Sequence, residues 1–393
     1  MTPAAFPMAR VCPYRLPPGY TGLRAAGPVT RVSLGGGEWV WVVTDHDEVR
    51  ALLTDPRMSS DSTNPAHPEL GLPPGAPRPT PAQRLAVQTF VEMDDPGHRA
   101  QRRMVIPYFT VRRARRLRDH IQRTTDRLLD RMLAGTDPAD LVTALAVPLP
   151  AFTLCRIFGV PQRDHRFFVT HAAVPVRSKK DAGPAFSALA DYIDGLLEDP
   201  ATARGDHLLG ELARRVEAAE LARTRAVDMV MMLLVAGHET TANTIALGTL
   251  TLLAHPGSWS AAPLPAVVEE VLRHSSVADT VPRVAVDDVE IGGQRIRAGD
   301  GVILLLAAAN RDEAVFPAAD DFDPRRPHPR HLSFGYGPHQ CLGQNLARVE
   351  VEVVLSTLRR RVPALRLARP AHQIPVKPAL GLQGVTELPV AWR

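Results

Sequence analysis

The chain has 393 residues, of which 45% are hydrophobic and 22% are charged, and its formal net charge is +4. This is the composition of a globular protein, so the sequence excludes a disordered or fibrous chain. The balance of 46 basic and 42 acidic residues argues against a dedicated nucleic-acid binder. Nearly all of the basic residues are arginines, so motifs that depend on arginine alone are weak evidence.

The three cysteines, Cys12, Cys155 and Cys341, lie far apart and form no Cys-x-x-Cys pair. This spacing disfavours a zinc ribbon, a cysteine-ligated iron–sulfur cluster and a disulfide framework. The start of the chain has no apolar run typical of a signal peptide. No later stretch reaches the ~18 consecutive apolar residues of a membrane-spanning helix. The sequence therefore predicts a soluble, cytoplasmic protein with no membrane partner.

The N-terminal part predicts a small β region. Residues 1–28 are rich in proline and are expected to be extended. Residues 29–34 and 39–44 are typical of two hairpin strands around the glycines at 35–37.

A short helix is predicted at 45–53, with Asp45 as its N-cap. Residues 59–92 are again rich in proline and show no clear period, so we predict a long loop. Loops of this length inside a compact chain often carry function.

From about residue 97 to 260 the pattern is helical almost throughout. The predicted helices are 99–132 with a break near Pro107, 141–158, 164–173 and 186–197. The most distinctive helix is predicted at 220–254, because its second half is apolar on every face. A helix of this kind has to be buried all round.

The C-terminal part mixes short strands with helices. Its predicted elements are a helix at 264–274, strands near 284–289 and 301–306, an irregular run at 310–330, a helix at 342–361 and a two-stranded tail near 379–392.

Residues 334–343 read FGYGPHQCLG and directly precede a predicted helix. Three glycines and a proline specify a rigid turn whose backbone can approach a flat ligand closely. The positive end of the helix would favour the thiolate form of Cys341, which is a good soft ligand for a metal. The alternative is a small buried cysteine in a glycine-rich turn.

The full pattern, F-G-x-G-x-H-x-C-x-G, resembles the haem-binding loop of the cytochrome P-450 superfamily, in which the cysteine is the axial iron ligand. The six fixed positions match at Phe334, Gly335, Gly337, His339, Cys341 and Gly343. The resemblance implies a haem b with Cys341 as the metal ligand and Phe334 as a shield for its sulfur.

Residues 236–241, AGHETT, resemble the oxygen-activation segment of the same family. The resemblance implies that Ala236 and Gly237 lie beside the haem and that Gly237 leaves room for oxygen there. It also implies that Thr240 hydrogen-bonds this oxygen and that Glu239 relays protons. A carboxylate and two threonines inside an apolar helix are costly without partners. The alternative is a helix bent by threonines that bond back to the preceding turn, and both readings can hold together.

Glu270 and Arg273 in EEVLR resemble the E-x-x-R pair of the family, and Arg326 in FDPRRP would complete their network. Such a buried network would be structural rather than catalytic. Removal of one partner would leave an unpaired charge and cost roughly 3–5 kcal/mol.

His98 and Arg102 resemble the H-x-x-x-R pair that binds haem propionates, and their spacing places both on one helix face. Arg283 and His339 match two further propionate contacts of the family. For any one of these residues, a solvated surface charge is the alternative.

The resemblance extends over nearly the whole chain and implies a mainly α fold with a small β region. In that fold the haem lies between the long central helix and the helix after the cysteine loop. We expect a single domain over residues 1–393. Its β-rich part would take in about 29–58, 280–306 and 375–392, and its helical part about 97–275 and 342–361.

The resemblance implies a haem-thiolate monooxygenase of the soluble bacterial branch. It would use O2 and two electrons to hydroxylate or epoxidise a bulky, largely apolar small molecule, and a polyketide or peptide natural product is the leading hypothesis. Oxidative coupling or ring formation on the same haem is the alternative. A non-catalytic haem sensor would not need Glu239 and Thr240, and the same pair disfavours a peroxide-driven enzyme.

Electrons are expected from a separate ferredoxin and its reductase, because the chain shows no flavin or iron–sulfur domain. The arginines that could form a docking face for an acidic partner are Arg112, Arg113, Arg115, Arg116, Arg359, Arg360 and Arg361.

The substrate pocket is expected to include Leu234, Ala236, Val284 and Leu382, with the segments 59–92 and 164–197. We expect a monomer.

Overall fold

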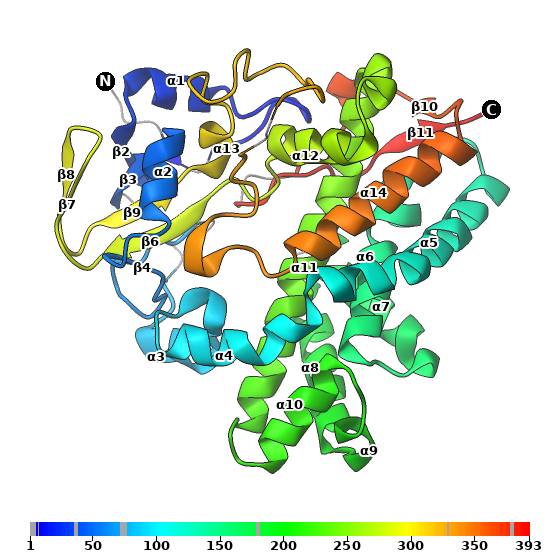
Figure 1. Ribbon diagram of the computed structural model, residues 1–393, viewed down its shortest axis with the longest axis horizontal. Coiled ribbons are helices and arrows are strands. Elements are labelled where there is room, and N and C mark those ends of the chain that lie inside the picture. Colours follow the sequence, from blue (N-terminus) through cyan, green and yellow to red (C-terminus); the bar gives the residue numbers. More distant parts are fainter. Residues whose placement is uncertain are drawn as a thin grey trace. The chain divides into compact units, whose positions relative to one another are not determined.

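The chain forms two compact units whose segments alternate along the sequence. The computed structural model describes residues 5–6, 8–34, 38–70, 77–177, 181–327, 330–377 and 381–393 (Figure 1). The first unit consists of Met1–Asp94, Leu247–Cys341 and Arg369–Val385, and the second of Asp95–Ala246, Leu342–Ala368 and Thr386–Arg393. The prediction of a single domain stays a prediction.

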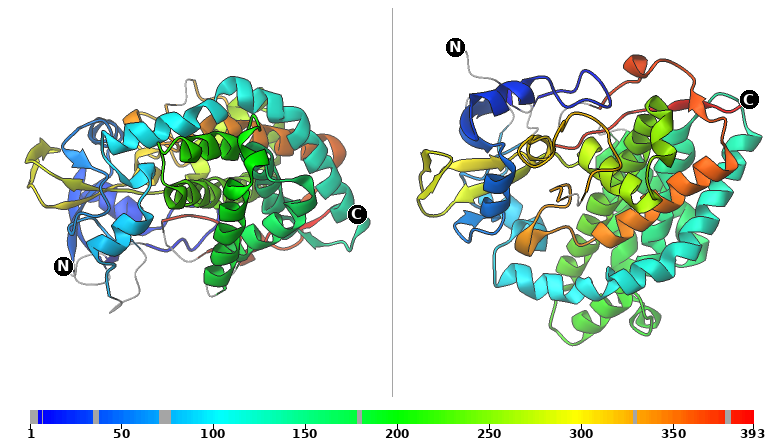
Figure 2. Two further views of the ribbon diagram at one scale, coloured as in Figure 1. Left: turned by 90° about the horizontal axis from the view of Figure 1, so that it is seen from below. Right: turned by 45° about the horizontal axis from the view of Figure 1, so that its top comes forward.

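A six-stranded mixed sheet forms the centre of the first unit, in the order β1-β2-β3-β9-β6-β4 (Figure 1). Its strands are β1 (Ala5–Phe6), β2 (Val29–Leu34), β3 (Trp39–Val43), β4 (Met58–Ser59), β6 (Val281–Ala285) and β9 (Gly301–Leu304). All four residues of β9 are buried, because this strand lies between β3 and β6. The hairpin of β7 (Val289–Ile291) and β8 (Gln294–Ile296) extends from this sheet in both views of Figure 2.

The predicted hairpin of β2 and β3 is confirmed, with Val29 opposite Val43. Its glycine turn at 35–37 lies outside the described residues. The predicted helix after β3 is also confirmed as α2 (His46–Leu52). The carboxylate of its N-cap Asp45 accepts hydrogen bonds from the backbone N–H groups of Asp47 and Glu48, which would otherwise be unsatisfied.

Two predictions for the N-terminal part were wrong. Residues 1–28 are not extended throughout, because α1 (Gly19–Ala26) packs Tyr20 and Leu23 into the core of the first unit. The predicted loop at 59–92 contains α3 (Pro81–Val87). This helix begins with a capping box between Thr80 and Gln83 and has proline at its first position, which is a standard helix start.

The helices predicted at 264–274 and 342–361 are confirmed, whereas the short helix Leu306–Ala309 was not predicted and the predicted strands were partly wrong. The first unit contains α12 (Leu264–Ser275) and α13 (Leu306–Ala309), with β6 beginning earlier than predicted. The predicted two-stranded tail is wrong, because β11 (Pro389–Ala391) pairs with β10 (Arg366–Leu367) and β5 (Ala139–Asp140) in the second unit. Residues 378–380 of that tail lie outside the described residues.

The second unit is helical. Its helices are α4 (Gly97–Val105), α5 (Val111–Ala134), α6 (Pro148–Phe158), α7 (His165–Arg177), α8 (Ala182–Glu198), α9 (Pro200–Ala203), α10 (Leu208–Glu217) and α14 (Gln344–Arg361). The break near Pro107 is confirmed by a 3-10 turn at Ile106–Tyr108. Figure 1 shows α5 and α14 side by side, and they run parallel, since Arg118 pairs with Glu352 and Arg361 pairs with Asp126.

The long apolar helix is α11 (Arg223–Ala254), which begins three residues later than predicted and contributes residues to both units. None of the helices that the structure describes is both long and apolar enough to cross a membrane.

A buried carboxyl group lies between α14 and α6 in the second unit. Glu350 is 2% exposed, and burial raises its pKa from about 4.5 to about 8, although a hydrogen bond with Thr153 opposes the shift. A carboxyl group whose pKa is raised by folding binds a proton on folding between these two pH values. Glu350 ionises in the unfolded chain over this range but keeps its proton in the folded protein, so the free energy of unfolding falls progressively as the pH rises from about 4.5 to about 8.

We expect Glu350→Gln to stabilise the protein more at pH 8 than at pH 5.5, by about 1–3 kcal/mol, because the amide cannot become an unpaired buried charge. Thermal unfolding followed by circular dichroism at the two pH values measures this difference. Glu352→Gln is the control, since Glu352 is on the same helix but is paired with Arg118. An equal effect of Glu350→Gln at both pH values would contradict the buried ionisation.

Candidate functional site

The loop before α14 presents Cys341 at the surface of the first unit. Gly335 and Gly337 have φ of +65° and +76°, a backbone region that favours glycine. The Cys341 N–H donates to the Phe334 carbonyl at 2.8 Å, which closes the loop. Cys341 is exposed, so the alternative of a buried structural cysteine does not describe this residue.

The three cysteines differ in how readily they can supply a thiolate. Cys155 is fully buried, and burial raises the pKa of its thiol well above the ordinary value. Cys12 is half-buried in the N-terminal segment. Of the three, only Cys341 is exposed, and it comes three residues before α14 begins at Gln344.

The imidazole of His339, in the same loop, is connected to a carboxylate. Its Nε2 lies 3.2 Å from the Ser60 hydroxyl, and the Ser60 N–H donates to Asp94 Oδ1 at 2.8 Å. The Ser59 hydroxyl donates to the other oxygen of Asp94. The carboxylate of Asp94 thus fixes the segment that contacts His339.

Arg283, on β6, is a buried cation. It is 6% exposed, and burial lowers its pKa to about 10, an effect that the charge of Asp94 opposes. Among the described residues Arg283 makes no ion pair, and its guanidinium donates to the adjacent Pro282 carbonyl at 2.8 Å. A carboxylate group of a ligand would stabilise such a buried guanidinium by forming an ion pair with it.

In the second unit, α4 carries His98 and Arg102 at positions i and i+4, so they share one helix face. His98 is buried, and its Nδ1 lies 3.2 Å from Asp95 Oδ1. The other ring nitrogen of His98, Nε2, is buried as well.

Part of α11 just before Thr240 is exposed, whereas residues 241–252 are buried. Val235 is 45% exposed and Ala236 is also exposed, whereas Leu234 and Ala242 are each 2% exposed. Positions 236 and 240 are one helical turn apart, so exposed apolar surface and a hydroxyl adjoin.

Thr240 and Glu239, the two residues of this segment that are expected to handle protons, differ in their surroundings. The Thr240 hydroxyl donates to the Ala236 carbonyl at 2.5 Å, and the Thr244 hydroxyl repeats this bond to the Thr240 carbonyl at 2.8 Å. Thr240 therefore bonds back to the preceding turn, as the alternative reading expected, while the bend of the helix and the bond of Thr241 that this reading also implied stay predictions. Glu239 is 7% exposed, and its neighbour His238 is held by the Val147 carbonyl at 2.7 Å.

Glu270, Arg273 and Arg326 meet in the first unit. Arg273 donates to both carboxylate oxygens of Glu270 at 2.8 and 2.7 Å, and Arg326 Nε donates to one of them at 3.2 Å. Arg273 is fully buried and Glu270 is 2% exposed. The network contacts the irregular run after α13, because Arg273 also binds the carbonyls of Asn310 and Ala319.

The four residues predicted for the substrate pocket differ in exposure. Ala236 is exposed and Leu382 is half-buried, whereas Leu234 and Val284 are buried. Sequence reasoning missed Val235, whose exposure breaks the all-round burial expected of its helix. It also missed Ser60 and Asp94, because nothing in the local sequence indicates contact with a loop far along the chain.

Each unit by itself has features that fit a haem. The first offers an exposed cysteine for the metal and a buried arginine for a carboxylate, and the second offers an apolar helix face next to a hydroxyl. These are the groups that a flat apolar macrocycle with acidic side chains and a metal requires.

Comparisons with known proteins agree with these features. The sequence profile of the family described as "Cytochrome P450" matches residues 263–361. The chain is similar to "Pentalenic acid synthase" from Streptomyces avermitilis, with 46% identity over 99% of this chain and 98% of the relative. It is also similar to "Vitamin D3 dihydroxylase" from Streptomyces griseolus, with 44% identity over 99% and 96%.

Among solved structures, the fold is similar to that of mycinamicin VIII C21 methyl hydroxylase from Micromonospora griseorubida bound to mycinamicin VIII. The TM-score is 0.87, and 37% of residues are identical over 99% of this chain and 100% of that one. With relatives this similar over nearly its whole length, the chain belongs to the cytochrome P450 family, and it is a monooxygenase whose haem b is held by a cysteine thiolate.

Proposed function

We propose that this chain inserts one oxygen atom from O2 into a bulky, largely apolar small molecule of bacterial secondary metabolism. The proposal is supported mainly by the relatives named above, which are a synthase of pentalenic acid and hydroxylases of vitamin D3 and of mycinamicin VIII. A polyketide or peptide natural product remains our leading hypothesis for the substrate. The exposed apolar surface at Val235 and Ala236 suits a substrate of low polarity.

Oxidative coupling without insertion of oxygen is the second candidate, and the product mass separates the two. Incubation of the enzyme with a substrate that it binds, surrogate redox proteins and NADPH should give a product heavier by one oxygen atom. A product lighter by two hydrogen atoms would instead support coupling.

When bound, the haem supplies the activation of O2 with electrons delivered one at a time. We assign the metal-ligand role to Cys341 and the binding of the haem carboxylates to His98, Arg102, Arg283 and His339. Phe334 is assigned to shielding the sulfur of Cys341 from water. The backbone of Gly335 and Gly343, together with Ala236 and Gly237, would leave space for the macrocycle and for oxygen.

Cys341→Ser should abolish the far-shifted Soret band that a sulfur-ligated haem gives when it is reduced in carbon monoxide. A hydroxyl is a harder and more weakly acidic ligand than a thiol, so the serine cannot replace the thiolate. The measurement is the absorption spectrum of the reduced, carbon monoxide-treated protein. Cys12→Ser is the control and should keep the band, whereas persistence of the band in Cys341→Ser would exclude this assignment.

The hydroxyl of Thr240 is proposed to hold and move a proton beside the exposed part of α11. While it donates to Ala236, its oxygen can still accept a hydrogen bond. To donate to another acceptor it has to rotate away from that carbonyl. The buried carboxyl group of the adjacent Glu239, in its protonated form, is proposed to resupply the proton and to be left as the carboxylate.

Thr240→Ala should therefore leave NADPH consumption largely intact while the product formed per NADPH falls about fivefold or more. Parallel assays of NADPH, product and peroxide measure this loss of coupling. Thr244→Ala is a matched control, because it removes the same kind of back-bond one turn further along α11. If Thr240→Ala stays fully coupled, the proton-transfer role is wrong.

We further propose a separate ferredoxin as electron donor, in the cytoplasm, docking on part of the predicted basic face. The arginines of this face form two separate groups. One group is at the start of α5 and the other at the end of α14, and since the two helices run parallel, these ends lie apart. Arg112 and Arg116, on one face of α5, lie beside the first turns of α14, whereas Arg360 lies roughly 20 Å further along α14. Arg113 and Arg361 are already paired with aspartates.

Arg112→Glu combined with Arg116→Glu should raise the KM for an acidic ferredoxin about tenfold at low salt and flatten the dependence of the reduction rate on salt. Arg360→Glu carries a charge reversal at the other end of α14 and should change this KM less than twofold. Steady-state reduction with increasing ferredoxin and NaCl measures both. Salt-independent rates in the unmodified enzyme would contradict electrostatic docking.

A further inference from the structure

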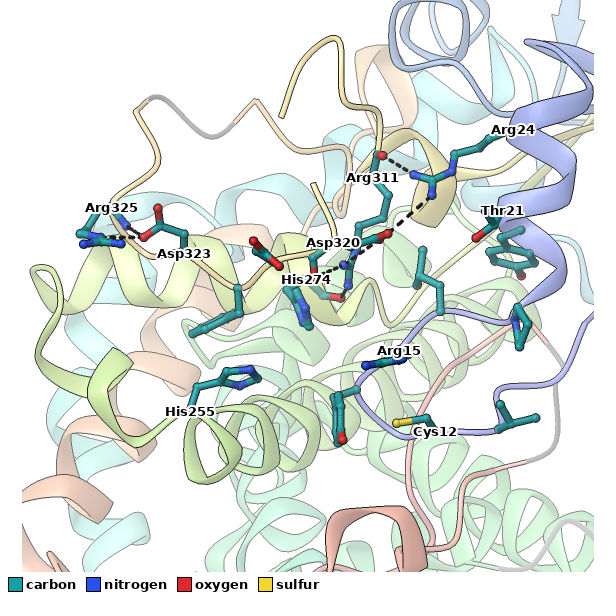
Figure 3. A pocket seen from close by; sticks show the side chains of 17 residues that line it. Cys12, Arg15, Thr21, Arg24, His255, His274, Arg311, Asp320, Asp323 and Arg325 are labelled. Carbon is teal, nitrogen blue, oxygen red and sulfur yellow. Dashed lines mark hydrogen bonds and ion pairs between the residues drawn. The ribbon is translucent and has the colours of Figure 1, made fainter. Parts of the chain in front are cut away.

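A pocket of about 1000 Å3 lies within the first unit, and none of the residues assigned to the haem lines it (Figure 3). Its walls come from the N-terminal segment that leads into α1, from His255 after α11, from His274 in α12 and from the irregular run that contains Arg311 and Asp320. The function proposed above does not use this pocket.

The buried part of the lining, here called the floor of the pocket, contains a cation, Arg311. Arg311 is 2% exposed, donates to the carbonyls of His274 and Asp320 at 2.8 and 3.0 Å, and has its pKa lowered to about 9, chiefly by burial. The pKa of the adjacent His274 is lowered well below its ordinary value, first by burial and then by the charges of Arg311, Arg273 and Arg10. The imidazole is therefore neutral, and the charge at the floor is that of the guanidinium.

A second cation, Arg15, belongs to the N-terminal segment that lines the pocket. Arg15 is exposed, lines the pocket and makes no ion pair among the described residues (Figure 3). Arg24 is less available, because it donates to the Arg311 carbonyl and lies 3.9 Å from the carboxylate of Asp320. Arg15 is thus the guanidinium with the most hydrogen-bonding capacity to offer a ligand.

Three carboxylates also line the pocket, and two of them are already paired. Asp320 lies within 3.9 Å of both Arg24 and Arg311, and Asp323 binds Arg325 at 2.8 Å at the edge (Figure 3). The third, Asp321, is exposed to solvent, as Arg15 is. The four arginines of the lining outnumber these three aspartates.

The remaining lining is largely apolar or aromatic and includes Val11, Leu16, Pro18, Tyr20 and Phe322. We propose that this pocket binds a small organic anion with an apolar body, of the type of an aromatic carboxylate. The anionic group binds Arg15, and the apolar body packs against the side chains of the N-terminal segment and Phe322.

The test uses the haem-loaded enzyme and isothermal titration calorimetry with 2-naphthoate, together with its uncharged counterpart 2-naphthamide. Naphthoate should bind, and the amide should bind about tenfold more weakly. Arg15→Gln should weaken naphthoate about tenfold and leave the amide unchanged, because it removes only the charge-assisted contact. Thr21→Trp, which fills part of the pocket from an exposed position on α1, should weaken both ligands.

Arg297→Gln is the matched control, since it removes the same charge from an exposed residue that does not line the pocket. It should change naphthoate affinity less than twofold. The proposal is overturned if naphthoate does not bind, if Arg15→Gln and Thr21→Trp both leave its affinity unchanged, or if Arg297→Gln weakens it as much as Arg15→Gln. Circular dichroism of each variant excludes misfolding as the cause of a loss.

Discussion

The thiol of Cys341 is held at the surface by a loop whose backbone path leaves no room for a side chain at Gly337. A Cβ atom there would lie 2.7 Å from the Thr54 Cγ2 and 2.9 Å from the Leu53 carbonyl, which follows α2 directly. The position of the loop therefore depends on α2, which is fixed by its N-cap Asp45 and by buried side chains on one face. The local shape of the loop that carries Cys341 is thus set by a helix from the N-terminal part of the chain.

A buried guanidinium organises the irregular run that leads to this loop. Arg273 carries its charge into a fully buried position, where Glu270 neutralises it. The carbonyls of Asn310, Ala319 and Asp321 accept its remaining N–H groups. The side-chain oxygen of Asn310 in turn accepts from the Leu332 N–H at 2.7 Å. Because an unpaired charge would be left behind, loss of either member of the ion pair would destabilise the whole segment. This explains how a segment with little regular structure can hold a defined path.

Periodicity and caps in the sequence predicted the long elements of this fold, since α11, α14 and the β2–β3 hairpin each bury a face that their own sequence reveals. Short elements such as α3 were missed, although Thr80, Pro81 and Gln83 carry a helix-start signal. The pairing of β11 with β5 could not be predicted, because it joins residues about 250 positions apart. For the candidate site, spacing indicated which residue types serve a haem. Only the fold reveals that Ser60 and Asp94 fix the segment beside His339.

The two readings of the threonines in α11 are compatible because a helix carbonyl can accept two hydrogen bonds. Ala236 O takes one from the backbone N–H of the next turn, as in any α-helix, and a second from the Thr240 hydroxyl. Rotation of the hydroxyl toward another acceptor then costs only the second bond, about 0.5–1.5 kcal/mol, and leaves the helix intact. The back-bond thus keeps the hydroxyl in a defined resting orientation on an apolar face, from which it can turn to donate when an acceptor arrives.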